Sequence, residues 1–449
     1  MLRASGTLAI SAVLLFSASA GALERQAGSD YRARRQALAA KATNGLVLLF
    51  APAEAEGPND LYGYRPDDNF FYLTGWSEPG AALLVSPEVP AVSGAGFRPY
   101  REVLFLPERN RSQEKWTGPK LGPDNPQAAE IAGVDNVDSL DHLSAELARL
   151  LVPPTTVVYT DTPAQGQTSN SATMLPYLRA ANAFPIRSSF ADVRPMLSLL
   201  RTFKDTGEIA RLRKATDASI AAQLAAMRAL KPGMNEREIS ALLQYEWGKR
   251  GCERPAYAPI VGAGFRSTVL HYSDDSHLIE AGDVVVIDAA GEYSMYASDL
   301  TRTLPASGRF SPRQREIYGV VLGAQQAAMA AFVSGKSHLQ RGQPDSLYQV
   351  AYDYINSHGK DLHAQSLGPY FIHGLGHYLG LNVHDPGDYT VPLSPGAAFT
   401  LEPGIYLPEE KIGVRIEDDF YVDGNGSLID LSQALPRTAD EVERVMSGQ

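Results

Sequence analysis

The second half of the sequence contains the same order of elements twice, two helices followed by several short strands. In the first copy, Asp205 with Glu208 forms a capping-box pattern that predicts a helix to about residue 230, where Lys231-Pro232-Gly233 ends it. A second cap pattern, Asn235 with Glu238, predicts a helix that ends near residue 251. The apolar segments that follow favour strands: AYAPIVGAG, VLHYS, DVVVIDAA and MYASDLTRTL.

The second copy begins at Ser311-Pro312, where Gln314 completes another capping pattern and predicts a helix to about residue 333. A further helix is expected from Asp345 to Ser357, with strands in the remainder. The copies start at residues 205 and 311, so they are 106 residues apart, a period too long for a solenoid. We therefore predict an internal duplication, with two helix-pair-plus-sheet halves facing each other across a cleft suited to chemistry.

Residues 23–195 predict a separate α/β domain. Helical patterns at Asp30–Ala42 and Leu140–Leu151 alternate with strand-like segments, which favours a mostly parallel or mixed sheet covered by helices. A boundary near Arg194-Pro195 leads into the second domain, residues 205–435. Four short apolar runs, each closed by proline or a polar residue, fit buried strands of the first domain: Gly45–Pro52, Ala82–Pro87, Glu102–Pro107 and Thr155–Asp161.

The N-terminus has the features of an export signal. Arg3 precedes an apolar run that ends in Ala18-Ser19-Ala20, so residues 1–20 predict a signal peptide with an AxA-type cleavage site. An uncleaved anchor is the alternative. No later segment approaches 18 consecutive apolar residues, so we expect a periplasmic or secreted protein with no membrane span after cleavage.

The net charge restricts the expected partners, and the cysteine content restricts the possible disulfides and metal sites. The net charge is −11 and no sustained Lys/Arg block occurs, which argues against nucleic acid or an anionic membrane surface as the main partner. Cys252 is the single cysteine, so an internal disulfide and a cysteine-based zinc site are excluded. We expect Cys252 to be a small buried residue rather than a nucleophile.

Three of the nine histidines, His373, His377 and His384, fall within the stretch from 368 to 385. Imidazole is the commonest metal ligand and the commonest acid or base near neutral pH. The HxxxH spacing resembles the helical zinc-peptidase motif, but Gly374 stands where that motif needs Glu, and three glycines disfavour a regular helix. We expect an irregular strand or loop lined with histidines, although one or two of them could be hydrogen-bonded structural residues.

Two pairs of carboxylates lie at spacings that fit β-hairpins. Asp288 ends the run VVVID, and a hairpin turning around Tyr293-Ser294 would place Asp299 directly opposite, with Cβ atoms about 4.5–5.5 Å apart. The same arithmetic opposes Glu402 and Glu417 around a turn in PEEKIG. Four carboxylates in one cleft repel one another, and two divalent cations about 3.5–4 Å apart would compensate and form a hydrolytic centre. One imidazole with mainly oxygen ligands suits Mn²⁺, Co²⁺, Fe²⁺ or Zn²⁺ without choosing among them.

Five segments together carry a resemblance to a known family: AYAPIVGAG…VLHY, VVIDAAGEY…ASDLTRT, FIHGLGHYLGLNVHD, FTLEPGIY and GVRIEDD. The second half of the chain, about Asp205 to Ser432, resembles the pita-bread metallopeptidases, and among them the aminopeptidase P and prolidase branch. The first domain resembles that branch more loosely, through EKWTGPKLG and the aromatic stretch NFFYLTGWSEP, which we expect at an interface within the fold or between subunits. The resemblance implies an α/β N-terminal domain followed by a pita-bread catalytic domain, a duplicated helix-pair-plus-antiparallel-sheet fold.

The resemblance also implies a ligand set for two divalent cations, for which we expect Mn²⁺ first and Co²⁺, Fe²⁺ or Zn²⁺ as alternatives. Asp288 would chelate one ion, Asp299 and Glu417 would bridge both, and His377 and Glu402 would complete the other. A hydroxide bridging the metals would be the nucleophile, with Glu402 as a proton shuttle.

Further residues are implied to surround the substrate. His271, His373 and His384 would line its site, with His384 near the scissile carbonyl oxygen. Arg415 lies two residues before Glu417 in a predicted strand, so it would share that face and either orient Glu417 or bind substrate. Some relatives carry an acidic residue that contacts a neighbouring subunit where this chain has Asn69, so the resemblance leaves open whether Asn69 has any such role.

The sequence thus predicts an exported dinuclear metallo-aminopeptidase that releases the first residue of peptides with proline in second position. Specificity for Xaa-Pro peptides is implied by the resemblance alone, and a prolidase restricted to Xaa-Pro dipeptides is the main alternative. A metal-free creatinase-like amidinohydrolase and a non-enzymatic binding module are less favoured, because both should have lost ligands and all five are present. We also expect a homo-oligomer, since relatives are often dimers or tetramers.

Overall fold

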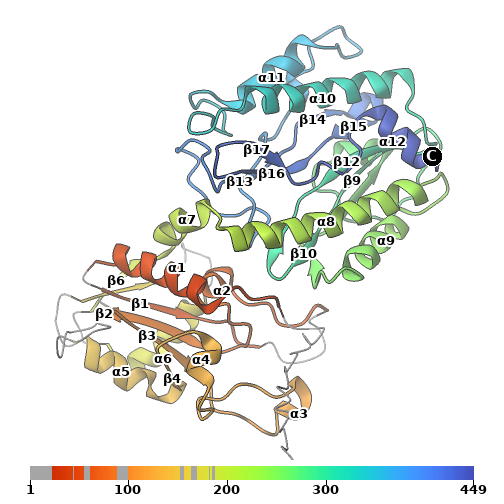
Figure 1. Cartoon of the computed structure of the whole chain (residues 1–449). Coiled ribbons are helices and arrows are strands. Elements are labelled where there is room, and N and C mark those ends of the chain that lie inside the picture. Colours follow the sequence, from red (N-terminus) through yellow and green to blue (C-terminus); the bar gives the residue numbers. More distant parts are fainter. Residues whose placement is uncertain are drawn as a thin grey trace, which may run out of the picture.

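The computed structural model describes residues 23–43, 45–54, 61–87, 100–151, 156–162, 169–181, 183–184 and 188–448. The segment predicted as a signal peptide, residues 1–20, lies outside the described residues. The chain forms an N-terminal and a C-terminal body, joined by helix α7 (Arg194–Thr202) and the start of the long helix α8 (Thr206–Ala229) (Figure 1). In the described part of the chain, no helix is long and apolar enough to cross a membrane.

The N-terminal body is built on one six-stranded mixed sheet. Helices α1 (Gly28–Lys41) and α2 (Asp68–Thr74) pack on one face of the sheet, and α5 (Leu143–Leu150) and α6 (Asn170–Ala180) pack on the other. In spatial order the strands are β4 (Asn136–Ser139), β3 (Tyr100–Leu106), β2 (Ala82–Pro87), β1 (Gly45–Phe50), β5 (Val157–Thr160) and β6 (Ser189–Asp192). Pairs β1–β2 and β2–β3 are antiparallel, whereas β3–β4, β1–β5 and β5–β6 are parallel.

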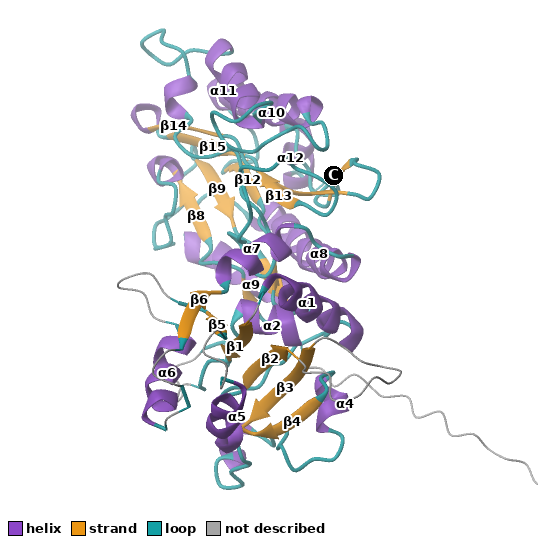
Figure 2. Ribbon diagram, turned by 90° about the vertical axis from the view of Figure 1, so that its left-hand side faces the viewer, coloured by secondary structure: helices purple, strands orange, loops and turns teal. Residues whose placement is uncertain are grey.

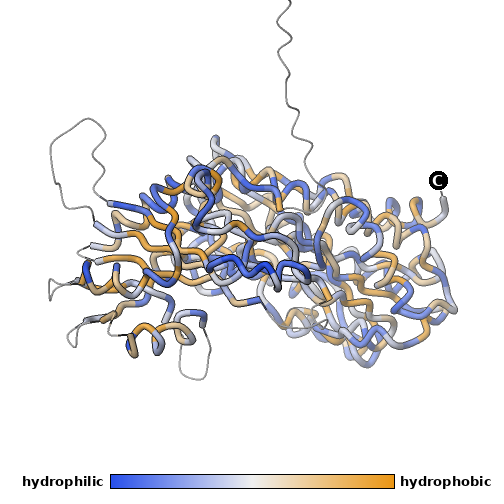
Figure 3. Tube along the Cα trace, turned by 90° about the horizontal axis from the view of Figure 1, so that it is seen from below, coloured by the Kyte–Doolittle hydropathy of each residue, from blue (hydrophilic) through white to orange (hydrophobic). Residues whose placement is uncertain are grey.

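The prediction of a mixed α/β sheet is confirmed. All four expected strands are present. Helices cover both faces of the sheet, so the centres of β1, β2 and β3 and alternate residues of β5 are buried. These strands are predominantly apolar along their length, as the hydropathy colouring shows (Figure 3). Strands β4 and β6 were not expected from the sequence. Two short helices, α3 (Glu114–Thr117) and α4 (Ala128–Ala132), complete this body.

The aromatic stretch lies at an interface within the fold. Helix α2 begins after Asp67, whose carboxylate accepts the Phe70 N–H at 2.9 Å, and Gly75 ends it in the left-handed conformation. The side chains from Phe70 to Leu73 are buried, and the Tyr72 hydroxyl donates to the Leu200 carbonyl of α7 at 3.1 Å. The stretch therefore packs the N-terminal sheet against the helix that leads into the second domain.

The C-terminal body contains the expected pair of helices in each half. The capping boxes at Asp205, Asn235 and Ser311 are all present, and they start α8, α9 (Glu236–Gly248) and α10 (Pro312–Ala331). The fourth helix, α11 (Leu347–Ser357), starts two residues later than expected, because Ser346 provides its cap. These helices and α12 (Ala439–Met446) lie around the strands (Figure 2).

The strands of this body form small antiparallel sheets that meet at the centre. A bridge between Thr301 and Glu417 joins the two halves, and the Glu417 N–H donates to the Thr301 carbonyl at 3.1 Å. The first half supplies β7 (Arg254–Pro255), β8 (Ile260–Ala263), β9 (Val284–Asp288), β10 (Gly291–Tyr293), β11 (Tyr296–Ala297) and β12 (Thr301–Pro305). The second half supplies β13 (Ala398–Leu401), β14 (Gly404–Leu407), β15 (Ile412–Arg415), β16 (Asp418–Val422) and β17 (Leu428–Asp430).

The prediction of a strand at VLHYS is wrong. A 3₁₀ turn spans Gly264–Thr268, and the chain after it forms turns and coil. The turn packs against β15, where the Gly413 N–H donates to the Ser267 hydroxyl at 2.8 Å, and a Cβ at Gly413 would collide with the Ser267 carbonyl. This tertiary contact holds the chain in the 3₁₀ turn directly before VLHYS.

The two hairpins differ in how well the sequence predicted them. In the second hairpin, Gly404 pairs with Arg415 and Leu401 with Asp418, a register that opposes Glu402 and Glu417 as predicted. In the first hairpin, Asp288 pairs with Thr301 and not with Asp299, so the predicted register is wrong by two residues. The turn lies at Ser294-Met295, one position later than expected, with φ of +47° and +74°.

Candidate metal centre and active site

Each of the four predicted carboxylates lies where the hydrogen-bonded ladder of its hairpin is interrupted. Asp288 is the last residue of β9, and Asp299 lies between β11 and β12. Glu402 follows the end of β13, and Glu417 lies between β15 and β16. An interrupted strand can turn its side chains away from the alternating pattern of a regular sheet. The interruptions therefore allow side chains from four strand ends to converge on one point.

The loop that carries the three histidines has the irregular form predicted for it. The backbone of His377 pairs with Thr400, and a Cβ at Gly376 would collide with the Thr400 carbonyl, so this close approach requires glycine. The Nδ1 atom of His377 donates to the Tyr378 carbonyl at 3.1 Å. This contact leaves Nε2 facing the carboxylates, 3.3 Å from Asp299 Oδ2 and 3.4 Å from Glu402 Oε1.

Tyr257 and Thr301 also contact the carboxylates, and the sequence reasoning assigned a role to neither. The Tyr257 hydroxyl lies 2.6 Å from Asp288 Oδ1 and 2.5 Å from Asp299 Oδ1, so it holds the two aspartates together. The Thr301 hydroxyl donates to Glu417 Oε2 at 2.6 Å, across the junction of the two halves. Tyr257 lies in the quoted segment AYAPIVGAG, which was the one signal that could have drawn attention to it.

Arg415 is buried and contacts three different groups of the site. It donates to Asp288 Oδ2 at 2.6 Å, to the Thr301 hydroxyl at 3.2 Å and to the Tyr406 hydroxyl at 2.8 Å. Tyr406 in turn lies 2.8 Å from Nε2 of His373. Nδ1 of His373 lies 2.8 Å from the Gly374 carbonyl, which can only accept, so Nδ1 carries a proton. Burial, together with the nearby Arg415, lowers the pKa of His373 to about 4, so the ring is neutral at pH 7 and its Nε2 accepts from the Tyr406 hydroxyl.

Among the described residues, His271 and His384, the other two histidines predicted for the site, lack the hydrogen bonds that fix the rings of His373 and His377. Within the part of the chain that the structure describes, His271 and His384 have no hydrogen-bonding partner, and both are exposed to the cavity. The ring of His384 packs edge-on against His377, with centroids 4.3 Å apart. These two side chains are thus placed to contact a molecule that enters the cavity.

The electrostatics of the site reflect crowded acidic groups. Burial raises the pKa of Asp288, an effect that Arg415 opposes, and burial together with Asp299 raises the pKa of Glu402 to about 7. Burial lowers the pKa of His377, but its contacts with Asp299 and Glu402 outweigh that effect and raise it to about 9. The protein alone thus supplies too little positive charge for this set of carboxylates.

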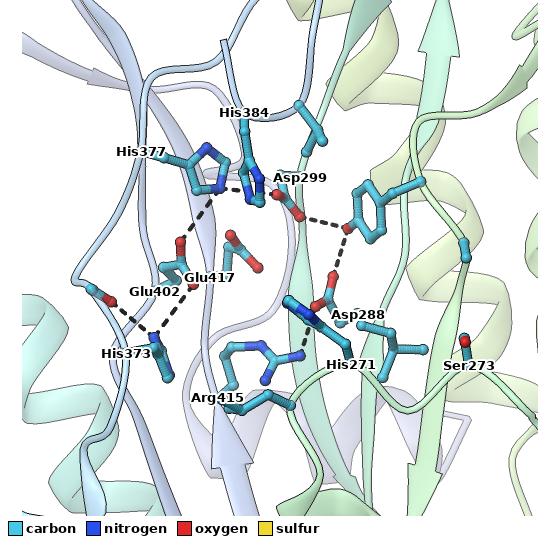
Figure 4. Close-up of a pocket in the computed structure, with 16 residues that line it drawn as sticks. His271, Ser273, Asp288, Asp299, His373, His377, His384, Glu402, Arg415 and Glu417 are labelled. Carbon is cyan, nitrogen blue, oxygen red and sulfur yellow. Dashed lines mark hydrogen bonds and ion pairs between the residues drawn. The ribbon is translucent and has the colours of Figure 1, made fainter. Parts of the chain in front are cut away.

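All nine residues predicted for the site line one cavity of about 440 Å³ (Figure 4). Figure 4 shows the carboxylates and His377 converging at its centre, with His271 and Arg415 at the lower side and His384 above. The cavity also has an apolar wall that includes Ile260, Leu270 and Val383. The nine predicted residues are His271, Asp288, Asp299, His373, His377, His384, Glu402, Arg415 and Glu417.

The donor set fits divalent cations. Ligand atoms of Asp299, His377 and Glu417 lie within 4.8 Å of one another. Their buried setting and the fixed orientation of the His377 ring are both features of metal sites in proteins. Carboxylate oxygens with one imidazole suit first-row transition ions such as Mn²⁺, Fe²⁺, Co²⁺ or Zn²⁺.

A duplicated antiparallel fold with buried carboxylates and one imidazole at its central cavity defines a metallopeptidase with a pita-bread catalytic domain. The family models agree. Residues 210–424 match metallopeptidase family M24, and residues 31–159 match the aminopeptidase P N-terminal domain. The chain belongs to the aminopeptidase P group of this family, and it is a metallo-aminopeptidase of the Xaa-Pro aminopeptidase-like type.

Individual relatives match over nearly the whole chain. The Xaa-Pro aminopeptidase of Escherichia coli K12 is 33% identical over 93% of this chain and 97% of the relative. Human Xaa-Pro aminopeptidase 3 is 31% identical over 92% of this chain and 83% of the relative. The solved structure of proline aminopeptidase P II from Yersinia pestis has a TM-score of 0.80 at 32% identity, covering 94% of this chain and 100% of that one. A Zn-substituted E. coli aminopeptidase P in complex with product also has a TM-score of 0.80, at 31% identity and with 95% and 99% coverage.

Proposed function

We propose that this enzyme hydrolyses the first peptide bond of peptides with proline in second position, using two divalent cations. The observation that carries the proposal is the convergence of His377 with three carboxylates in the cavity. Its Nε2 lies 3.3 Å from Asp299 and 3.4 Å from Glu402, and the ligand atoms of Asp299, His377 and Glu417 lie within 4.8 Å of one another. The names of its relatives, Xaa-Pro aminopeptidases from bacteria and mammals, support the substrate class.

The proposed ligands are those that the resemblance to the family implies. Asp288 would hold one cation, Asp299 and Glu417 would hold both, and His377 and Glu402 would hold the other. When bound, such a pair of cations activates a water molecule and polarises the scissile carbonyl group. Mn²⁺ is our first expectation, with Co²⁺, Fe²⁺ and Zn²⁺ as alternatives, since all of them accept this ligand type.

The remaining polar residues would bind and orient the substrate. Glu402 is the proposed proton shuttle, because its carboxylate lies between His377 and the Nδ1 atom of His373, 3.7 Å away. His384, next to His377 and without a hydrogen-bonding partner among the described residues, is proposed to donate to the scissile carbonyl oxygen. His271 would bind the substrate from the opposite wall. Arg415, each of whose three guanidinium nitrogens already donates to a group of the site, is proposed to fix Asp288 rather than to contact substrate.

The apolar wall of the cavity offers a place for a proline ring. Proline has no N–H to donate, so a pocket that lacks an acceptor at that point loses nothing when it binds proline. Ile260, Leu270 and Val383 supply such a surface. A prolidase specific for dipeptides has the same chemistry and remains the alternative activity.

Several broader features belong to the same proposal. We propose a cleaved signal peptide at residues 1–20, followed by export, an N-terminal domain at 23–195 and a catalytic domain at 205–435. The family matches at 31–159 and 210–424 fall inside these two domain ranges and support them. A homo-oligomer is proposed from the resemblance alone.

Digestion of a peptide panel tests the proposal. The purified protein, treated with a chelator and then given Mn²⁺, Co²⁺ or Zn²⁺, is incubated with Xaa-Pro dipeptides, Xaa-Pro-containing tripeptides and matched Xaa-Ala peptides. We expect release of the first residue from the tripeptide with proline, dependent on added metal. Cleavage of the dipeptide alone would identify a prolidase, and metal-independent cleavage would contradict the proposed centre.

A further inference from the structure

Two buried glutamines lie behind the carboxylates, one on the long helix of each half. Gln223 on α8 and Gln325 on α10 are both fully buried. Each stands six residues before the last residue of its helix, since α8 ends at 229 and α10 ends at 331. They occupy equivalent positions in the duplicated fold, and neither lines the cavity.

Gln223 contacts the first hairpin at its interruption. Its amide nitrogen lies 3.3 Å from the Ile287 carbonyl, 3.3 Å from the Ala289 carbonyl and 3.0 Å from the Leu300 carbonyl. The first two carbonyls flank Asp288, and the third belongs to the residue after Asp299. One side chain therefore spans both strands at the point where the two aspartates leave the sheet.

Gln325 makes the corresponding contacts in the second half. Its amide nitrogen lies 2.9 Å from the Leu401 carbonyl and 3.4 Å from the Ile416 carbonyl. These residues directly precede Glu402 and Glu417. A third contact, at 2.8 Å, reaches the carboxylate of Asp418, on the other side of Glu417.

Both glutamines leave their amide oxygens, Oε1, buried without a hydrogen-bonding partner in the described residues. An unpaired buried polar atom costs about 1–3 kcal/mol, so a methionine or leucine would pack these positions at lower cost. The amide N–H groups must therefore do something that an apolar side chain cannot do. Their acceptors are the carbonyl groups next to all four carboxylates.

We propose that Gln223 and Gln325 are a pair of positioning residues. Each holds the two strands of one hairpin together where the hydrogen-bonded ladder is interrupted, and so fixes the geometry of two carboxylates. The inference rests on the proposed metal ligands. Without the amide, the carbonyls beside the ligands lose donors that span the two strands, and the carboxylates lose the fixed spacing that two cations require. The glutamines touch neither cation nor substrate, and they act through the backbone of the hairpins.

Substitution by methionine tests the inference, because it keeps length and volume and removes the donors. Gln223→Met, Gln325→Met and the double variant are compared with Gln326→Met, which alters an exposed neighbour on α10. Mn²⁺ affinity is measured by competition with a fluorescent chelator, and Tm is measured with excess chelator and with saturating Mn²⁺. We expect each buried substitution to weaken Mn²⁺ binding by about 10- to 100-fold, the usual effect of losing a residue that supports metal ligands.

The metal-free protein separates positioning from packing. If the glutamines position ligands, the Tm in chelator stays at or above that of the unaltered protein, while the rise in Tm on adding Mn²⁺ shrinks. Mn²⁺ affinity within twofold of the Gln326→Met control would overturn the inference. An equal loss of Tm in both conditions, or failure of both single variants to fold without metal, would assign a packing role and overturn it as well. If the unaltered protein binds no divalent cation, the proposed metal centre fails instead.

Discussion

Substitution of Asp385 by asparagine should strongly destabilise the junction between the two domains. Asp385 follows His384 in the active-site loop, and its carboxylate accepts from Arg201 of α7 at 2.5 Å and from Lys204 at 3.0 Å. All three side chains are buried, with exposures of 1%, 4% and 1% respectively. Asparagine keeps the shape of the side chain but removes the carboxylate that Lys204 and Arg201 share, and among the described residues Arg201 keeps an ion pair only with the more distant Asp68, at 3.8 Å.

The expected magnitude follows from that burial. Removing one partner of a buried ion pair costs about 3–5 kcal/mol, because the remaining charge stays desolvated. For a domain of this size, each kcal/mol lowers Tm by roughly 2–4 °C, so a fall of roughly 6–20 °C is expected. Thermal unfolding of the chelator-treated protein measures it. The matched control is Asp388→Asn in the same loop, since among the described residues the hydrogen bonds of the Asp388 carboxylate come from Thr390 alone.

The destabilisation caused by Asp385→Asn should depend on pH in a definite direction. Burial raises the pKa of Asp385, but Arg201 and Lys204 outweigh that effect and hold the pKa below its usual 3.8. A depressed pKa contributes stability that is present above the unfolded value and is lost as pH falls through the folded value. The difference in Tm between the unaltered protein and Asp385→Asn should thus be largest at neutral pH and should become smaller under acid conditions. A variant that unfolds within 2 °C of the Asp388→Asn control at pH 7 would refute the reasoning.

Three further predictions concern the site itself. Tyr257→Phe removes the hydroxyl shared by two aspartates and should lower activity and Mn²⁺ affinity by about 10- to 100-fold with the fold retained, as judged by circular dichroism. Gly376→Ala should cost about 1–3 kcal/mol or prevent folding, because its Cβ meets the Thr400 carbonyl. For Gly374→Ala the nearest atom among the described residues, the Gly376 carbonyl oxygen, is 3.9 Å away, so Tm should stay unchanged. Arg415→Lys should lower kcat sharply, since an ammonium group cannot keep three separate contacts, and kcat near the unaltered value would contradict this role.

Much of the fold could be predicted because its signals are local. The capping boxes at Asp205, Asn235 and Ser311 each lie within four consecutive residues, and each starts a helix where expected. The first hairpin was predicted in the wrong register for the opposite reason. Its turn residues, Ser294 and Met295, both adopt positive φ, which non-glycine residues rarely do, so the sequence carries no turn signal there. Distant contacts hold this turn, among them the Ser294 N–H donating to Glu253 at 2.8 Å.

The same difference between local signals and distant contacts explains which residues of the candidate site could be predicted. The histidines and carboxylates could be found because chemistry restricts metal sites to few residue types. Their supporting residues could not, because tyrosine, threonine and glutamine are common and their partners are distant in sequence. Tyr257 is separated from Asp288 by 31 residues, and Gln325 from Asp418 by 93. Only the tertiary structure reveals such pairs.

The duplicated fold brings two hairpins with carboxylates to one cavity. The difference in register between the two hairpins then determines how the carboxylates and the imidazole are arranged. In the second half Glu402 and Glu417 directly oppose each other, as two equivalent strands would place them. In the first half a two-residue offset puts Thr301 opposite Asp288, and the Thr301 hydroxyl then donates to Glu417 in the other half. Asp299 is thereby carried toward His377, 3.3 Å away, a residue that only the second half provides. Two halves with the same register would have arranged the carboxylates symmetrically. With the offset, one side of the site also has the imidazole of His377, and the hydrogen bond from Thr301 to Glu417 joins the two hairpins.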